Sequence, residues 1–190
     1  MLKSKKNYCL ILASGGLDST GCIKFYKNLK FDVELLFVDY GQPANKFEFN
    51  ALKKISKHYR IKVKRIVLKN SEVFKPGVIA GRNAFLLFTA LLNFKKKNGT
   101  IACGVHAGTN YFDCSKDFVK IMQELFDKYT QNTVKIGVPF LTFTKMEIYN
   151  YCISEKIPIE LTYSCELGTK KPCGHCNTCK DLKVIYASQK

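Results

Sequence analysis

Residues 8–19 read YCLILASGGLDS, an apolar run of six residues that passes directly into a glycine turn. The run has the length of a buried strand, and a helical pattern begins near Thr20. A strand, a glycine turn and a helix start form an anion site when they follow one another in this order, because the first N–H groups of a helix have no partner within it. We therefore expect a phosphate-bearing ligand at this turn.

The turn, residues 14–19, follows neither of two common phosphate-binding patterns. It lacks the Gly-x-x-x-x-Gly-Lys of a Walker loop and the glycine spacing of a dinucleotide fingerprint. Gly15 and Gly16 would let backbone N–H groups approach phosphate without a Cβ in the way. The sequence predicts a different phosphate cradle, and a tight turn with a helix N-cap is the alternative.

Polar side chains of the turn add donors and a carboxylate. Ser14, Ser19 and Thr20 can supply hydroxyl groups to a phosphate. Asp18 is unexpected in an anion site, and Mg²⁺ binding explains it best, since the metal would neutralise pyrophosphate and favour its departure.

Apolar runs of strand length alternate with longer helical patterns along the chain. Strands are expected at 8–13, 33–38, 63–68, 101–105 and 134–138. Helices are expected at 19–29, 45–59, 83–97, 116–129 and 144–155, the last with a capping box between Thr144 and Glu147. This alternation predicts an α/β fold of three layers, a parallel sheet with helices on both faces. Ligands of such sheets lie beyond the carboxyl ends of the strands, so residues 14–18, 39–42, 104–106 and 139–142 are the candidates.

Length and composition indicate one globular unit. The chain has 190 residues, 46% of them hydrophobic, and no apolar stretch approaches the roughly 18 residues of a membrane span. Residues 1–6 are basic, but the apolar run behind them is shorter than the roughly 7 to 15 residues of a signal peptide's apolar region. We expect a cytoplasmic protein that is not bound to a membrane.

The formal charge is +16, from 31 Lys and Arg against 15 Asp and Glu. Such a charge favours anionic ligands and brings nucleic acid into consideration. The lysines are dispersed without an aromatic-interleaved block, so we interpret them as solvated faces. Nucleic acid is a weaker expectation than a small anionic substrate.

Four of the nine cysteines follow a Cys-x7-Cys-x2-Cys-x2-Cys pattern, namely Cys165, Cys173, Cys176 and Cys179. Four thiolates make a closed tetrahedral set, which predicts a structural Zn²⁺, with His175 as an alternative ligand. We expect residues 1–162 to form the nucleotide domain and residues 163–190 a zinc-binding segment packed on it. The remaining cysteines, Cys9, Cys22, Cys103, Cys114 and Cys152, lie in or beside apolar patterns, where cysteine usually fills the core.

The glycine turn resembles the pyrophosphate loop of the ATP pyrophosphatases, which cleave ATP between the α and β phosphates and adenylate an oxygen of their substrate. Further stretches are similar to the 7-cyano-7-deazaguanine synthases of queuosine biosynthesis. They are FVDYGQ at 37–42, GRN at 81–83, Asp113-Cys114 and the cysteine pattern. The resemblance runs in one order from Leu10 to about Leu182. It implies a Rossmann-like sheet of the adenine nucleotide alpha hydrolase type and a homodimer.

The resemblance also implies roles for individual residues. ATP and Mg²⁺ would be bound by Ser14, Gly15, Gly16, Leu17, Asp18, Ser19, Thr20, Asp39 and Gly104. The deazaguanine would be bound by Tyr40, Gln42, Arg82, Asn83, Asp113 and Cys114, with Asp113 as an acceptor for the base's amino group. A plain loop without a ligand is an equal alternative for Asp113 and Cys114. Asp18, Arg82 and Lys145 would act in catalysis, the two cations as clamps at the α-phosphate. A solvated helix position is an equal alternative for Lys145.

The implied reaction is an ATP-dependent ligation of ammonia to 7-carboxy-7-deazaguanine. The carboxylate attacks the α-phosphate, ammonia forms an amide, and a second adenylation leads to the nitrile. No nucleophilic side chain is required, so the protein positions the reactants, neutralises charge and excludes water.

The chain departs from this pattern near the expected substrate. The loop between Leu68 and Ile79 is short, the stretch from Gly104 to Asp113 is compressed, Phe112 stands where the family has proline, and Tyr163 stands where it has tryptophan. One alternative is therefore an enzyme that conjugates the activated carboxylate to another amine. Two others are an ATP-dependent tRNA modifier, which the charge of +16 favours, and a silent binding module.

Overall fold

The computed structural model describes residues 7–68, 74, 77, 79–106 and 111–187. Its centre is a five-stranded parallel sheet with the strand order β3-β2-β1-β4-β5. The strands are β1 (Tyr8–Leu12), β2 (Asp32–Asp39), β3 (Val63–Val67), β4 (Gly99–Cys103) and β5 (Val134–Gly137). The parallel sheet and its helices confirm the expected α/β class.

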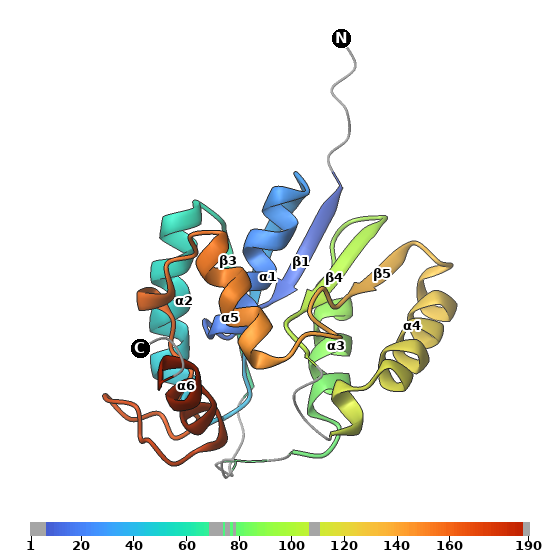
Figure 1. Cartoon of the computed structure of the whole chain (residues 1–190). Coiled ribbons are helices and arrows are strands. Elements are labelled where there is room, and N and C mark those ends of the chain that lie inside the picture. The colour runs from blue at the N-terminus through green and yellow to red at the C-terminus, as the bar shows by residue number, and fades with distance from the viewer. Residues whose placement is uncertain (1–6, 69–73, 75–76, 78, 107–110, 188–190) are drawn as a thin grey trace.

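Helices connect successive strands and cover both faces of the sheet (Figure 1). The α-helices are α1 (Leu17–Asn28), α2 (Asn45–Tyr59), α3 (Arg82–Leu92), α4 (Lys116–Thr130), α5 (Lys145–Ser154) and α6 (Asn177–Ala187). Two short 3₁₀ helices are η1 (Phe112–Cys114) and η2 (Ile159–Leu161). No helix in the described ranges is both long and apolar enough to cross a membrane.

Alternating side chains of each strand feed two separate cores. In β1, Cys9 and Ile11 pack with α1, α2 and α5, whereas Tyr8 and Leu10 pack with α3 and α4. Both sides of the strand are buried, which explains its continuous apolar run. The result is the expected three-layer arrangement, with α1, α2, α5 and α6 on one face and α3 and α4 on the other (Figure 1).

The strand order places a topological switch between β1 and β4. The chain runs outward from β1 through β2 to β3, then returns to the other side of β1 at β4. Because parallel crossovers are right-handed, this change of direction moves the connecting helices to the opposite face. The loops after β1 and β4 therefore diverge and leave room for a ligand at their carboxyl ends.

Two helix boundaries differ from the expectation by more than one residue, and one helix was not expected. Helix α1 begins at Leu17, two residues early, because Gly16 occupies the N-cap. Helix α3 ends at Leu92, five residues early, where the Asn93 amide donates to the Thr89 carbonyl. Helix α6 was not predicted, since the cysteine-rich segment offers few apolar residues. Its Ile185 nevertheless joins the core that α1, α2 and α5 share. The capping box of α5 is confirmed.

Candidate active site

A cavity of about 780 Å³ opens at the carboxyl ends of β1, β2 and β4. Its wall includes the turn after β1, the loops after β2 and β4, the starts of α2 and α3, and the C-terminal segment. The volume lies in the range of small-molecule sites, and the position is where a switch point predicts a ligand.

The turn after β1 presents the start of α1 to this cavity. Gly16 is the N-cap and has no side-chain cap. The hydroxyls of Ser19 and Thr20 both donate to the Gly16 carbonyl, at 3.1 and 2.8 Å, and Thr20 is fully buried. These hydroxyls hold the turn, so the anion-binding capacity lies in the backbone N–H groups of the first helical turn.

The glycines of the site are needed for close packing. A Cβ on Gly15 would lie 2.6 Å from the Glu48 carbonyl oxygen and 2.8 Å from the Leu52 nitrogen, and φ is +82°. A Cβ on Gly104 would lie 2.8 Å from the Asp18 backbone. Gly15 thus makes room for α2, and Gly104 lets β4 approach α1. At Gly15 this differs from the expectation that the missing Cβ faces a phosphate.

Asp18 and Lys145 form an ion pair on the cavity wall. The Lys145 ammonium donates to both carboxylate oxygens, at 2.7 and 2.6 Å, and its side chain is only 14% exposed. The alternative that Lys145 is a solvated helix residue is therefore wrong. The Thr144–Glu147 capping box fixes the start of α5 and with it the position of Lys145.

His106 lies beside this pair; it falls in the candidate range 104–106 but was not assigned a role from the sequence. Its Nε2 is 3.9 Å from the Asp18 carboxylate. Burial lowers the pKa of His106, and the nearby Asp18 only partly offsets that effect, so the neutral imidazole is favoured at pH 7. The signal in the sequence was its position just beyond the carboxyl end of β4, where ligands of parallel sheets bind.

Asp39 is bound by protein groups and is not among the described residues that line the cavity. Arg65 donates to its carboxylate at 2.6 Å, and the Asn45 side chain and the Gly41 amide donate as well. Burial acts to raise the pKa of Asp39, but these donors together lower it. The geometry gives Asp39 a role in shaping the loop after β2, and nucleotide binding by it stays a prediction.

The loop after β2 is held by Gln42. The Gln42 side-chain oxygen accepts from the Tyr40 amide at 3.0 Å, and its nitrogen donates to the Val38 carbonyl at 3.2 Å and to the Glu48 carboxylate at 3.1 Å. Tyr40, Gln42 and Glu48 all line the cavity. Sequence reasoning missed Glu48, although its place in the first helical turn beyond a strand end was a usable signal.

The other predicted substrate residues also meet at the cavity. Asn83, at the start of α3, donates to the Asp113 carbonyl at 3.1 Å and approaches the Cys114 sulfur at 4.0 Å. Arg82 lies beside the Tyr40 hydroxyl, and burial raises the pKa of Tyr40 more than this cation lowers it. The structure brings these residues together, and their contact with a substrate stays a prediction.

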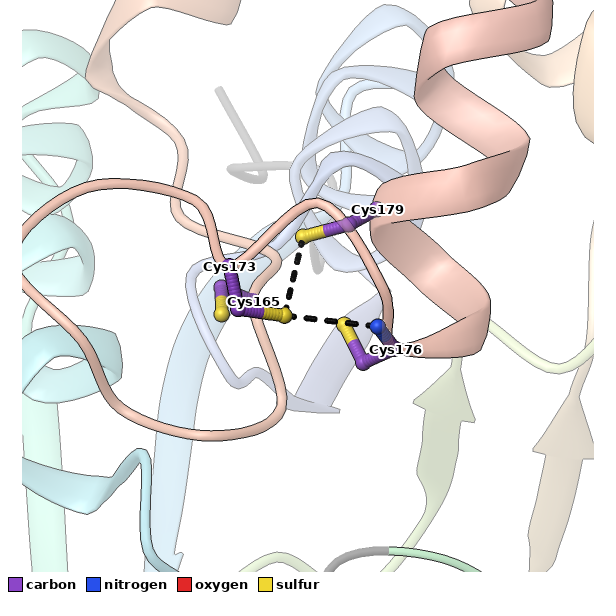
Figure 2. Close-up of side chains that lie close together, drawn as sticks. All are labelled: Cys165, Cys173, Cys176 and Cys179. Carbon is purple, nitrogen blue, oxygen red and sulfur yellow. Dashed lines mark hydrogen bonds between the residues drawn. The ribbon is translucent and has the colours of Figure 1, made fainter.

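The four predicted metal ligands converge in the C-terminal segment (Figure 2). The sulfur atoms of Cys165, Cys173, Cys176 and Cys179 all lie within 4.8 Å of one another, and those of Cys173 and Cys179 are 3.8 Å apart. Ligands of one tetrahedral ion with bonds of about 2.3 Å would be about 3.8 Å apart. His175 instead contacts the Cys173 carbonyl at 2.9 Å. The cluster fits a single metal ion.

The protonation of these thiols also favours a cation. Burial acts to raise the pKa of Cys165, but hydrogen bonds from Thr169 and the backbone lower it to about 5. The pKa of Cys179 is raised to about 12, first by burial and then by the neighbouring sulfurs. Thiolates this close repel one another, so a cation between them is needed for all four to lose their protons.

The cysteine-bearing segment forms part of the cavity wall. The Tyr163 amide donates to the Gly15 carbonyl at 2.9 Å, and the Tyr163 ring stacks on Phe47 of α2. Glu166 accepts from the amide and hydroxyl of Thr178 at the start of α6. Segment residues that line the cavity are Tyr163, Ser164, Glu166, Asn177, Thr178, Lys180 and Asp181. The segment that carries the four cysteines therefore also shapes the cavity.

The family model described as "Queuosine biosynthesis protein QueC" matches residues 8–79 and 68–188 of this chain. The chain belongs to the QueC family. A protein named 7-cyano-7-deazaguanine synthase from Prochlorococcus marinus strain MIT 9301 is 30% identical over 212 residues, covering 96% of this chain and 94% of the relative. One of the same name from Campylobacter jejuni subsp. doylei is 28% identical over 205 residues, covering 93% and 91%.

Solved structures with the same fold come from other enzymes. The U34-tRNA thiolase NcsA from Methanococcus maripaludis, described with its [4Fe-4S] cluster, has a TM-score of 0.60 at 15% identity and covers 97% of this chain and 66% of that one. NMN synthetase from Francisella tularensis has a TM-score of 0.51 at 11% identity, covering 97% and 78%. At these identities the likeness shows the fold alone.

This QueC-family chain is shorter than its relatives. The alignment with the Prochlorococcus protein spans 212 residues against the 190 present here, so the relative contains residues without a counterpart. The two stretches predicted to be shortened or compressed fall largely on residues 69–73, 75–76, 78 and 107–110, which lie outside the described residues.

Proposed function

We propose that this QueC-family chain is an ATP-dependent ligase that converts 7-carboxy-7-deazaguanine and ammonia to 7-cyano-7-deazaguanine. The observation that carries the proposal is the cavity at the switch point. A helix start suited to phosphate, the Asp18–Lys145 pair and predicted base-binding residues all line it. The names of the relatives support the choice of substrate.

The reaction needs positioned charge and a dry cavity. In the first step a substrate carboxylate oxygen attacks the α-phosphorus of ATP, and the bond to the β-phosphate breaks. The N–H groups at the start of α1 and the ammonium of Lys145 would stabilise the phosphate charge. Asp18 would hold Mg²⁺, which would neutralise the departing pyrophosphate. Exclusion of water protects the acyl adenylate from hydrolysis.

Two further transfers complete the proposed sequence. Ammonia attacks the acyl carbon, AMP leaves, and one proton is lost to give the amide. The amide oxygen then attacks the α-phosphorus of a second ATP, and loss of AMP and the remaining N–H protons gives the nitrile. Both carboxylate oxygens leave on AMP, so two ATP are consumed per nitrile formed.

We also propose that the bound metal is Zn²⁺ with a structural role. The four cysteine ligands close a tetrahedral shell, which leaves no open position for a substrate. A [4Fe–4S] cluster, as named for the NcsA structure, would hold its cysteine sulfurs further apart because each binds a different iron. The 3.8 Å separation of Cys173 and Cys179 favours the single ion.

Turnover with ATP, Mg²⁺, ammonium and 7-carboxy-7-deazaguanine tests the proposal. We expect the nitrile with two AMP and two pyrophosphate per product, measured by mass spectrometry. AMP with amide as the final product would contradict nitrile synthesis and favour a conjugating enzyme. ADP in place of AMP would contradict adenylation itself.

A further inference from the structure

Glu48 places a carboxylate in a cavity that is otherwise suited to anions. It lies in the first turn of α2, lines the cavity and is partly buried. Its backbone carbonyl abuts Gly15, where a Cβ would come within 2.6 Å. Glu48 is thereby fixed against the turn after β1. A carboxylate repels a phosphate because both are negatively charged. The part of the ligand next to Glu48 should therefore donate hydrogen bonds.

The Glu48 carboxylate is oriented but not neutralised. Gln42 donates to one of its oxygens at 3.1 Å, and Gln42 is itself held by Tyr40 and Val38. No Lys or Arg of the described residues lies within ion-pair distance of Glu48. Hydrogen bonds through Gln42 therefore hold the Glu48 carboxylate in the cavity wall. Such a held polar group in a cavity is typical of ligand binding.

The two substrates of the proposed reaction differ in what they offer a carboxylate. A 7-deazaguanine presents a ring N–H next to an exocyclic amino group, two donors side by side that match two carboxylate oxygens. Adenine presents its amino group next to an acceptor nitrogen, which a carboxylate repels. The chemistry thus favours the deazaguanine at Glu48.

We propose that Glu48 binds the ring N–H and 2-amino edge of the deazaguanine and so selects for a 2-amino base. This inference rests on the proposed function. It differs from the expectation from family resemblance that Asp113 accepts from the amino group. In the structure an Asp113 carboxylate oxygen is approached by the Cys114 thiol at 3.9 Å.

The test combines a substitution with a substrate analogue. Glu48→Gln retains an oxygen that can accept from Gln42 but loses the carboxylate. Binding of 7-carboxy-7-deazaguanine is measured by calorimetry without ATP, alongside the 7-deazahypoxanthine analogue, which lacks the 2-amino group. Wild type is expected to bind the analogue about 10- to 100-fold more weakly. Glu48→Gln should bind the deazaguanine more weakly than wild type by a similar factor. It should bind the deazaguanine and the analogue with nearly the same affinity.

Matched variants show whether Glu48 or Asp113 binds the amino group of the base. Glu34→Gln makes the same chemical change at a carboxylate that accepts from Tyr8 outside the cavity, and its affinities should match wild type. Discrimination that survives in Glu48→Gln but disappears in Asp113→Asn would overturn the inference. The inference would also be overturned if Glu48→Gln bound the deazaguanine normally but no longer distinguished ATP from purine riboside triphosphate, which lacks the adenine amino group. Glu48 would then bind adenine. If wild type binds no deazaguanine, the proposed function itself fails.

The pH dependence supplies a further prediction. Burial raises the pKa of Glu48 to about 6, and Gln42 and Arg82 limit the rise while Asp39 adds to it. The carboxylate gains a proton as pH falls through this value and loses an acceptor. Affinity for the deazaguanine is expected to fall as pH drops below about 6 in wild type and to level off about 10- to 100-fold lower, the same loss expected for Glu48→Gln. Glu48→Gln should show no such limb, and a limb that persists in it would assign the titration to another group.

Discussion

Replacement of Asp18 by asparagine is expected to lower kcat/KM for AMP release by about 10³-fold, equal to about 4 kcal/mol of transition-state stabilisation. Asp18 occupies the second position of α1 on the cavity wall, and both of its oxygens receive hydrogen bonds from Lys145. The substitution removes the proposed Mg²⁺ ligand and the charge partner of Lys145 together. Single-turnover formation of AMP measures the loss directly.

Asp117→Asn is the matched control for this substitution. Asp117 also occupies the second position of a helix, α4, but is exposed and is not among the residues that line the cavity. Each change removes a carboxylate from a helix start, which costs roughly 0.3 to 1 kcal/mol of stability. Both variants should stay folded by circular dichroism, and only Asp18→Asn should lose AMP release. Turnover retained in Asp18→Asn would remove the role assigned to this carboxylate.

Cys176→Ser is expected to lower metal content, stability and nucleotide binding together. A serine hydroxyl is a poor zinc ligand, and metal binding contributes folding energy directly. Loss of about 3 kcal/mol would lower Tm by on the order of 10 °C for a chain of this size. Because the segment supplies Tyr163 and Lys180 to the cavity wall, affinity for ATP should also fall. Elemental analysis, thermal unfolding and calorimetric titration with ATP give the three readouts.

Cys152→Ala separates loss of metal from loss of packing. Cys152 is fully buried in α5 and packs in the core, away from the four-cysteine cluster. Its truncation should lower Tm while one metal ion per chain is retained. If Cys176→Ser kept a full complement of tightly bound metal, the four-thiolate site would be wrong.

Local sequence patterns predicted the sheet and most helices because their signals lie within single elements. Strand β1 is buried on both sides, so its sequence is a continuous apolar run. Thr144 and Glu147, three residues apart, form the capping box that indicated the start of α5. The cysteine spacing predicted a cluster whose four sulfurs the fold does bring together. Helix α6 gave a weaker pattern, because only part of its surface meets the core.

Contacts between residues far apart in the chain could not be predicted from local sequence patterns. The carboxylate of Asp18 and the ammonium of Lys145 are 127 positions apart and meet only because α1 and α5 pack side by side. Gly15 looked like a phosphate-binding glycine, yet its missing Cβ accommodates α2. Asp39 looked like a ligand group, but Arg65 from the neighbouring strand binds it. Pairing of this kind depends on strand order, which no local pattern contains.

The central claim is that ATP activates the substrate carboxylate by adenylation, and oxygen labelling tests it most directly. Turnover of 7-carboxy-7-deazaguanine with both carboxylate oxygens as ¹⁸O is followed by mass spectrometry of AMP. The proposed sequence predicts that each AMP carries one ¹⁸O and that two labelled AMP form per nitrile. Unlabelled AMP would show that the carboxylate never attacked the α-phosphate, and would contradict the account.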